Sequence, residues 1–340
     1  MTIGFTLAAY SVVANDSVQT LGTFIASNSE KFKWYILAAA ASLVLCFTLL
    51  NGWYFNDGDI SYGRLNKIPF QEIKWYHAAA PGFLLLLTRF GIPVSTTFLV
   101  LSAFASTVVL EKVLIKSVIG YALAAVIAYI LWIVISRYIN EKFDVVKNPE
   151  RWRVFQWLTT GFLWYTWLSH DMANIAVFLP RDLPFVMLLG IMGLLTFLLF
   201  YIFYEKGGRI QSIVLEKRGT RFIRSATIID GVYAFILLYF KYYNDIPMST
   251  TWVFVGLLCG RELAIATVVS DYKLGYVFPI IGKDFLKMIM GLTVSVAIVL
   301  AIHYVIIPGG YEDINISLAW LRLCLLYTSP SPRDVEESGI

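Results

Sequence analysis

Eight apolar stretches dominate this chain of 340 residues and constrain its fold more than any other feature. A helix that crosses about 30 Å of hydrocarbon needs about 20 mostly apolar residues. The stretches are 3–26, 34–51, 75–109, 113–136, 155–180, 184–204, 223–268 and 288–307. Soluble domains carry about 25% charged residues, whereas this chain carries 15% and has a mean hydropathy of +0.70. We therefore predict an all-α polytopic membrane protein with about 8–11 membrane segments.

The remaining composition excludes several other classes of protein. A net charge of +4 without a clustered basic face argues against a nucleic-acid partner. Three cysteines, two of them in apolar stretches, imply neither a disulfide framework nor a metal framework. The first ten residues contain no Lys or Arg, so the start lacks the charged region of a signal peptide and is interpreted as the first membrane segment.

Polar residues interrupt four of the apolar stretches near their middles. Stretches 75–109 and 223–268 are long enough for two crossings or two half-helices, and each contains a proline within a polar patch. Stretches 3–26 and 155–180 contain charged or amide residues instead. Polar groups at membrane depth must be satisfied by protein or by a water-filled cavity. We therefore expect the four interruptions to share one cavity.

The interruptions recur as two matched pairs, which indicates an internal duplication. Asp16 in VANDSVQTLG and Asp171 in LSHDMANIAV are 155 positions apart, and GIPVSTTF and DIPMSTTW are offset by 154. A repeat of this size is typical of a duplicated transporter half. We predict a first repeat over 1–140, a linker over 141–154, a second repeat over 155–310 and the start of a truncated final segment over 311–323.

Loop charges favour an inverted relation between the two repeats. Loop 205–224 carries six basic and two acidic residues, while the equivalent loop 52–74 carries three of each. Lys and Arg accumulate in cytoplasmic loops, so loop 205–224 is predicted to be cytoplasmic and loop 52–74 to lie on the opposite side. The alternative is that 205–224 is simply a solvated basic loop.

The end of the chain differs in composition from everything before it. CLLYTSPSPRD, residues 324–334, resembles the translation of a transposase adapter used in DNA library preparation. We therefore set 324–340 aside as an adapter-derived artefact and expect the natural protein to continue differently after Leu323. A genuine disordered tail is the alternative.

The Ser-Thr-Thr patches have the residue types of a helix start that binds an anion. Proline fits the first turn of a helix, and hydroxyls cap its free amides. Those amides and the helix dipole favour an anion. The patches are Ser95-Thr96-Thr97 and Ser249-Thr250-Thr251. Either patch alone is as well explained by a proline kink, but recurrence together with the aspartates favours an oxyanion site.

Asp16 and Asp171 raise the free energy of membrane insertion, since an ionisable group inside a membrane segment requires a partner or solvent. Two carboxylates at equivalent positions indicate cation coordination or proton handling, and oxygen ligands suit sodium. A carboxylate also accepts a hydrogen bond from a protonated oxyanion, which phosphate supplies at neutral pH and sulfate does not. The alternative for either residue is an aspartate that caps a broken helix end.

These paired motifs resemble the inorganic phosphate transporter family, whose members are sodium- or proton-coupled phosphate permeases. The resemblance spans about residues 5–270. It implies two inverted-topology repeats with broken or re-entrant helices that meet at a central site. It also implies substrate binding by Asn15, Gln19, Ser95, Thr96, Thr97, Asn174, Ser249, Thr250 and Thr251, and cation coupling by Asp16, Asp171 and His170. Sodium is expected at Asp16, Asp171, Thr97 and Thr251.

The chain departs from the family pattern at several positions. Gln19 and His170 replace asparagines, and Phe98 and Trp252 replace the histidines that usually follow Ser-Thr-Thr. His170 can titrate near neutral pH, although a neutral imidazole bonded to a carbonyl is the simpler interpretation. Arg89 either reaches toward an anion or extends to the interface.

The predicted function is uptake of inorganic phosphate with sodium by alternating access, without enzymatic activity, catalytic residues or cofactors. The expected partners are phosphate, sodium, the lipid bilayer and a second copy in a homodimer, with no nucleic acid; the expected location is a bacterial inner membrane. One alternative is a proton-coupled permease or a permease for another oxyanion such as sulfate. A more distant alternative is a membrane-embedded, metal-dependent enzyme.

Overall fold

The computed structural model describes residues 2–68, 72–90, 94–104, 107–138, 148–208, 211–216, 222–243, 249–268 and 274–302, and within them every regular element is a helix. The order is α1 (Thr2–Ser11), η1 (Val12–Asp16), α2 (Ser17–Asn28), α3 (Trp34–Phe55), η2 (Arg64–Lys67), α4 (Trp75–Arg89), η3 (Thr97–Leu101), α5 (Ser102–Phe104), α6 (Thr107–Tyr138), α7 (Pro149–Asp171), α8 (Ala173–Ala176), α9 (Phe185–Tyr204), α10 (Gln211–Leu215), α11 (Ile223–Tyr243), α12 (Thr250–Val268) and α13 (Leu274–Ala301). The two aligned prolines, segment 311–323 and the tail 324–340 lie outside the described residues.

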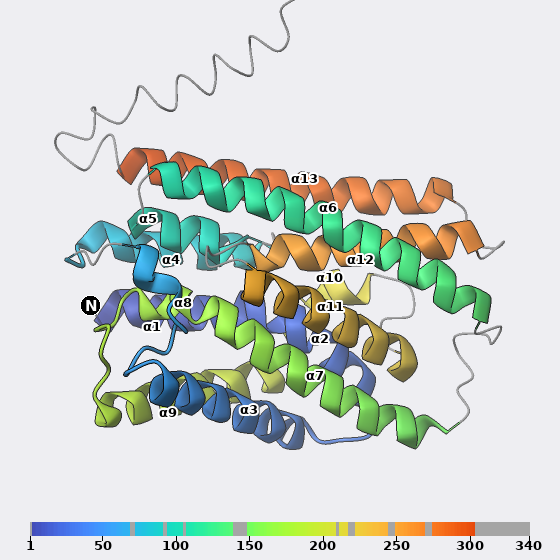
Figure 1. The fold of residues 1–340 in the computed structure, drawn as a ribbon, viewed down its shortest axis with the longest axis horizontal. Coiled ribbons are helices and arrows are strands. Elements are labelled where there is room, and N and C mark those ends of the chain that lie inside the picture. Colours follow the sequence, from blue (N-terminus) through green and yellow to red (C-terminus); the bar gives the residue numbers. More distant parts are fainter. Residues whose placement is uncertain are drawn as a thin grey trace, which may run out of the picture.

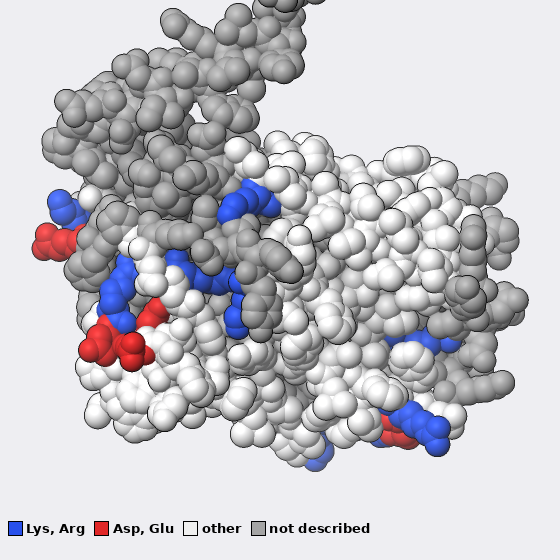
Figure 2. Space-filling view, in the orientation of Figure 1, with Lys and Arg blue, Asp and Glu red and all other residues white. Residues whose placement is uncertain are grey.

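The all-α membrane fold predicted from the sequence is confirmed. Six of the described helices are long and apolar enough to cross a membrane, namely α3, the 113–135 part of α6, α9, α11, α12 and α13. Large apolar side chains on the bundle's outside are exposed, among them Leu43 at 74% and Val186 at 79%. Charged side chains gather toward the two ends of the molecule, with a broad uncharged face between them (Figure 2). Such a surface is suited to lipid, and the chain is an integral membrane protein.

The helices lie along one common direction, and equivalent helices of the two predicted repeats run opposite ways (Figure 1). The continuous stretch α1–η1–α2 runs from left to right in that view, whereas α7 runs from right to left. The same reversal relates α3 to α9, and α6 to α13. The end of α9 and the start of α7 both lie toward the right-hand end. This arrangement is what an inverted duplication would produce.

Each of the two long interrupted stretches folds into a helical hairpin. In the first, α4 enters from the left-hand end, and η3 and α5 return to that end (Figure 1). In the second, α11 enters from the right-hand end and α12 returns there. The Ser-Thr-Thr patches, at the start of the returning arm of each hairpin, therefore lie within the bundle.

Two helices begin earlier than the apolar pattern indicates. α13 begins at Leu274 rather than near 288, because Lys283, Asp284 and Lys287 interrupt the hydropathy without interrupting the helix. α7 begins at Pro149, inside the segment predicted as a linker. Proline at the first helical position is compatible with helix geometry, and the following charged residues extend the helix beyond its apolar part.

Two glycines let α12 pack directly on the backbone of α6. A Cβ atom added at Gly256 would lie 2.3 Å from the carbonyl oxygen of Tyr121, and one at Gly260 would lie 2.0 Å from that of Ala125. The spacing Gly-x-x-x-Gly puts both positions on one face of α12. Since the obstructing atoms belong to backbone, a side chain here forces the two helices apart.

We expect Gly260→Ala to lower the midpoint of thermal unfolding in detergent, because overpacking of this kind costs about 1–3 kcal/mol. Gly193→Ala on α9 is the matched control, since nothing lies within 4 Å of a Cβ added there. Unfolding is followed by tryptophan fluorescence. Equal midpoints for the two variants would contradict the close approach of α6 and α12.

Candidate functional site

All twelve residues predicted to bind substrate or cation are buried, with 5% or less of each side chain exposed. They lie at irregularities of the helices. Asp16 ends the π-helical turn η1, Asp171 is the last residue of α7 before the chain re-forms a helix as α8, and Thr97 begins the π-helical turn η3. Such turns are frequent at functional sites because they free backbone groups within a helix.

The first carboxylate is held by the motif that precedes it and by the first Ser-Thr-Thr patch. Oδ1 of Asp16 accepts a hydrogen bond from Nδ2 of Asn15 at 2.6 Å, and Oδ2 accepts one from the hydroxyl of Thr96. Nδ2 of Asn15 also donates to the carbonyl oxygen of Val94 at 2.7 Å. The aspartate motif is thereby tied to the break of the first hairpin.

The second carboxylate has equivalent contacts in the second repeat. Oδ2 of Asp171 accepts a hydrogen bond from the hydroxyl of Thr250, the counterpart of Thr96. Oδ1 accepts one from Nδ2 of Asn174 at 3.3 Å. The indole of Trp167 and the phenol of Tyr233 hold Thr250 in turn, at 3.3 Å to its hydroxyl and 3.0 Å to its carbonyl oxygen.

The serines of both patches cap the turns that follow them. Oγ of Ser95 accepts a hydrogen bond from the amide of Phe98 at 3.3 Å, and Oγ of Ser249 accepts one from the amide of Trp252 at 3.2 Å. The rings of Phe98 and Trp252, at equivalent positions, lie 5.7 Å apart. The two hairpin breaks therefore face each other through these aromatic rings.

The two halves of the site meet at Asp171. The hydroxyl of Thr97, from the first repeat, lies 3.5 Å from Oδ1 of Asp171 and accepts a contact of the same length from Nδ2 of Asn174. Asp16 bonds to Thr96 and Asp171 contacts the adjacent Thr97, so the two carboxyl groups are held by neighbouring residues of one turn. Thr251, the counterpart of Thr97, is buried in the first turn of α12.

Amide groups around the carboxylates still have hydrogen-bonding capacity. Oδ1 of Asn15, Oδ1 of Asn174 and both polar atoms of the Gln19 side chain are buried without a hydrogen-bond partner. A buried polar atom without a partner is costly. These carbonyl oxygens and the amide nitrogen of Gln19 are suited to a bound cation and to an oxyanion, respectively.

His170 is oriented by a backbone carbonyl. Its Nε2 lies 2.7 Å from the carbonyl oxygen of Leu237, which only accepts, so this nitrogen carries a hydrogen. Nη2 of Arg64 lies 3.4 Å from the same nitrogen, and Nε of Arg64 donates to the carbonyl oxygen of Ser169 at 3.2 Å. The contact with Leu237 therefore fixes the orientation of the imidazole ring.

Two basic residues next to the second aspartate motif are not among the site residues predicted from the sequence. Arg64, in η2, is 5% exposed and acts electrostatically on Asp171. Nζ of Lys241 donates to the hydroxyl of Ser169 at 3.2 Å and lies 4.7 Å from the ring centre of Tyr62. Neither residue belongs to a duplicated motif, so comparing the two repeats of the sequence does not identify it.

Arg261 and Glu262 form a buried ion pair, although adjacent residues on a helix do not face each other. Nη1 of Arg261 donates to Oε1 of Glu262 at 2.7 Å, because the long guanidinium side chain folds back. Arg261 also donates to the hydroxyl of Ser225 at 2.9 Å and lies over the ring of Trp132. These contacts join α12 to α11 and α6, which is a structural role.

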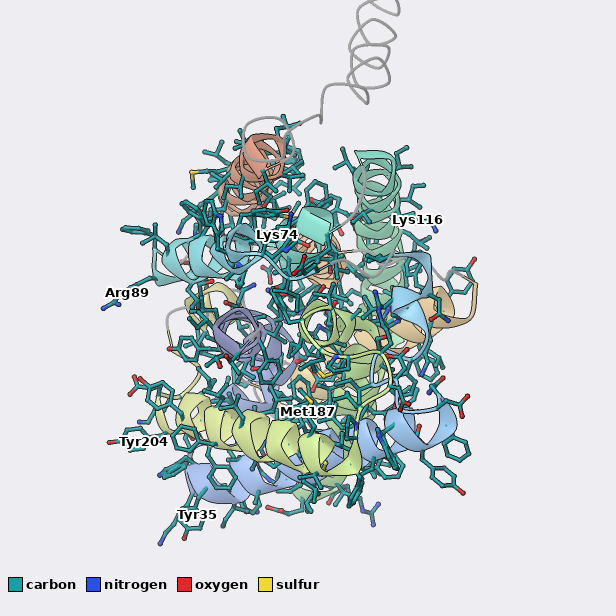
Figure 3. The ribbon with its side chains drawn as sticks, turned by 90° about the vertical axis from the view of Figure 1, so that its left-hand side faces the viewer. Tyr35, Lys74, Arg89, Lys116, Met187 and Tyr204 are labelled. Atoms are coloured by element: carbon teal, nitrogen blue, oxygen red, sulfur yellow. The ribbon has the colours of Figure 1, made fainter. Side chains whose placement is uncertain are left out.

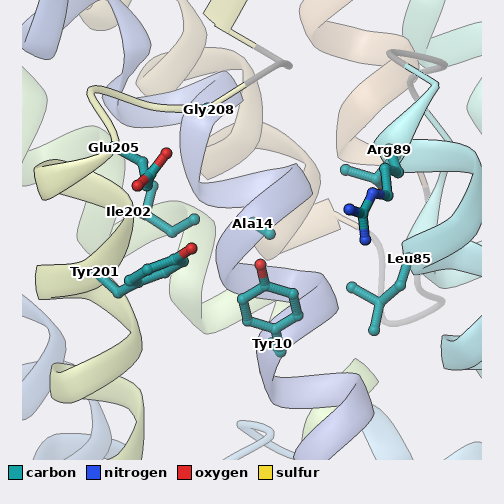
Figure 4. A pocket seen from close by; sticks show the side chains of 9 residues that line it. Tyr10, Ala14, Leu85, Arg89, Tyr201, Ile202, Glu205 and Gly208 are labelled. Carbon is teal, nitrogen blue, oxygen red and sulfur yellow. The ribbon is translucent and has the colours of Figure 1, made fainter.

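A cavity of about 460 Å³ reaches the helix turn that carries the first aspartate motif. Ala14, directly before Asn15, lines it together with Tyr10. Arg89 on α4 and Glu205 after α9 stand on opposite walls (Figure 4). Viewed end on, Arg89 extends from the periphery of the bundle (Figure 3). Arg89 therefore lies at the mouth of this cavity and not against the buried carboxylates.

We expect Ala14→Cys, in a background without native cysteines, to react with a membrane-impermeant maleimide added from the side that carries loop 205–224. The cavity gives the reagent access, and Glu205, the first residue of that loop, lines it. Val13→Cys is the control, since Val13 is 2% exposed and does not line the cavity. Equal labelling from both sides, or of both variants, would contradict one-sided access.

Comparison with known proteins gives two similarities. No family model matches the chain. A protein of Pyrococcus furiosus named as a candidate phosphate permease is 25% identical over 243 residues, which are 64% of this chain. The chain spans 53% of that protein's length. A solved structure described as the sodium-dependent phosphate transporter has a TM-score of 0.60 at 16% identity, covering 90% of this chain and 99% of the other.

Proposed function

We propose that this chain, a divergent member of the phosphate transporter family, carries inorganic phosphate across a membrane together with sodium by alternating access. The observation that supports the proposal best is the duplicated carboxylate–threonine pair. Asp16 with Thr96 and Asp171 with Thr250 are buried at breaks in helices and are brought together through Thr97. Isolated helix caps would not require two such pairs to meet.

Charge compensation gives a mechanism for coupling. Two buried carboxylates repel an anion, and sodium bound at Asp16 and Asp171 would remove that repulsion before phosphate enters. The hydroxyl and carbonyl oxygens around each carboxylate form an oxygen set suited to a hard cation. Unpaired buried charge then raises the free energy of a carrier that holds phosphate alone. A carrier loaded with both ions, or with neither, has less unpaired charge and can reorient. Uptake of phosphate therefore requires sodium.

Phosphate recognition is assigned to the hairpin breaks. Ser95 and Ser249 already cap their following turns, so the unpartnered amide nitrogen of Gln19 remains for the substrate. The threonine hydroxyls that donate to Asp16 and Asp171 become available to phosphate once sodium holds those carboxylates. A protonated phosphate oxygen can donate to a carboxylate oxygen, which keeps a lone pair for this bond when sodium is also bound. Sulfate carries no such proton at neutral pH, which supports discrimination between the two oxyanions.

The test is uptake of radiolabelled phosphate into proteoliposomes with an inward sodium gradient, compared with choline at equal ionic strength. We expect accumulation only with sodium. Accumulation driven equally by a proton gradient in choline would instead support the proton-coupled alternative. Competition by excess unlabelled sulfate would favour a permease for a different oxyanion. Lack of any gradient-driven accumulation would contradict the proposal.

A further inference from the structure

A second cavity, of about 330 Å³, lies at the end of the bundle that carries loop 205–224. The turn between α2 and α3 forms one wall, and the end of α9 forms the other. The walls thus come from both predicted repeats. None of the twelve residues predicted to bind substrate or cation lines this cavity in the described part of the chain. The transport site therefore does not explain it.

The cavity is lined by more basic than acidic residues. Lys31, Lys33 and Lys206 line it, together with Glu30. Lys31 forms an ion pair with Glu150, which does not line the cavity. Within the described part of the chain, Lys33 and Lys206 form no ion pair. Even with Glu30 set against one of them, the cavity keeps an excess of positive charge that suits an anion.

Lys206 occupies a backbone position that usually takes glycine. α9 ends at Tyr204, and Lys206 has a φ of 52°, in the left-handed region. Glycine, and less often asparagine, is the common residue just after a helix in this conformation. The amide of Gly207 closes the turn by donating to the carbonyl oxygen of Ile202 at 2.9 Å. Helix termination alone thus does not require lysine here, whereas a charged cavity wall does.

Aromatic rings place the cavity at the level of lipid head groups. Trp34, at the start of α3, is 39% exposed, and its ring centre lies 5.4 Å from that of Tyr204 at the end of α9. Tyr35 and Tyr204 extend from the periphery of the bundle on the same side (Figure 3). Exposed Trp and Tyr side chains are typical of the interface between lipid and water. Trp34 and Tyr35 also line the cavity, so it lies at that level.

An apolar surface adjoins the cavity. Its floor contains the buried side chains of Leu37 and Phe203. α3 and α9 pack against each other, and farther along them Leu43, Phe47 and Phe197 are exposed. Acyl chains attached to a head group in the cavity would cover this surface, and burial of apolar area favours binding. A free inorganic anion would make no use of it.

We propose that this cavity binds the head group of an anionic phospholipid, with the phosphate at Lys33 and Lys206 and the acyl chains along α3 and α9. The inference goes beyond the proposed function and does not depend on it. The cytoplasmic leaflet carries negative surface charge, and basic pockets between membrane helices on that side bind anionic head groups. The predicted cytoplasmic position of loop 205–224 agrees with this assignment. A zwitterionic lipid brings no net charge and would leave the excess positive charge uncompensated.

The test is quenching of tryptophan fluorescence by brominated lipids. The protein is reconstituted in phosphatidylcholine vesicles that contain the same minor fraction of brominated lipid, either phosphatidylglycerol or phosphatidylcholine. The part of the quenching that Trp34→Phe removes is the signal of Trp34. We expect a preference for phosphatidylglycerol of about fivefold for each of the two lysines, the contribution of one basic side chain near an anionic surface. Equal quenching of Trp34 by the two lipids would overturn the site.

Removing both lysines should abolish the preference. Lys33→Gln combined with Lys206→Asn removes both charges, and asparagine tolerates the left-handed backbone. We expect the preference for phosphatidylglycerol to fall by about 25-fold. Lys283→Gln is the matched control, since Lys283 is exposed, bonds to Glu216 of the same basic loop and does not line the cavity. An equal loss in this control would show a general effect of surface charge and overturn the site.

Two further arms separate the lipid from other occupants. Excess inorganic phosphate at constant ionic strength should leave the quenching of Trp34 unchanged, and displacement by phosphate would overturn the lipid assignment. Native mass spectrometry should show phosphatidylglycerol adducts on wild type that the double variant loses, and it covers failure of Trp34→Phe to fold. A lipid-free complex of two chains that only wild type forms would assign the surface to a second copy instead. None of these measurements involves phosphate flux, so their outcome is independent of the proposed function.

Discussion

Asp171→Asn should abolish sodium-driven accumulation of phosphate while leaving the protein folded. The amide has nearly the shape of the carboxyl group, but it cannot be charged, and a neutral residue has no charge for sodium to compensate. The side chain would keep an oxygen for Thr250 and would place an NH2 group toward Thr97 and Asn174. Loss of a charge-assisted site of this kind is worth several kcal/mol, so we expect uptake to fall by about 100-fold or more.

The measurement is initial uptake of labelled phosphate into proteoliposomes across an inward sodium gradient. Asp16→Asn is expected to behave in the same way, since its carboxyl group has the equivalent bonds to Asn15 and Thr96. Asp182→Asn, at an exposed position, is the matched control and should transport normally. Sodium-dependent uptake that survives in Asp171→Asn at the wild-type rate would remove this residue from the coupling mechanism.

The helical architecture was predictable because hydropathy reports directly on which segments lipid can surround. The breaks were predictable because the same polar residue types recur in both halves at nearly constant spacing. The residues at which helices begin were harder to predict from hydropathy. The start of α13 was predicted too late in the sequence, since Lys283 and Lys287 lower the local hydropathy without interrupting the helix.

The pairing inside the site was only partly predictable. The motifs indicated that aspartates and Ser-Thr-Thr patches share a cavity, but not that Thr97 of the first repeat faces Asp171 of the second. This contact depends on how the two hairpins are oriented, which linear spacing does not encode. The bond between Arg261 and Glu262 was not predictable for a related reason, since helical periodicity describes Cβ directions and not the reach of a long guanidinium side chain.

Arg64→Gln should shift the affinities for phosphate and sodium in opposite directions. Arg64 is buried beside the second aspartate motif, where its charge acts on Asp171 and on His170. A fixed positive charge at this position attracts phosphate and opposes sodium. Removing it should therefore raise the KM for phosphate and lower the sodium concentration that gives half-maximal uptake, each by about tenfold, or about 1.4 kcal/mol.

Arg64→Lys distinguishes charge from packing. Lysine keeps the positive charge but loses the planar donor set that reaches the carbonyl oxygen of Ser169 and the ring of His170. If Arg64 acts through its charge, Arg64→Lys keeps both affinities close to wild type. Arg64→Gln then weakens phosphate binding and strengthens sodium binding. A purely positioning role predicts that both variants lose phosphate and sodium affinity in parallel, because a displaced Asp171 serves neither ion. Initial rates measured over a grid of phosphate and sodium concentrations separate these outcomes.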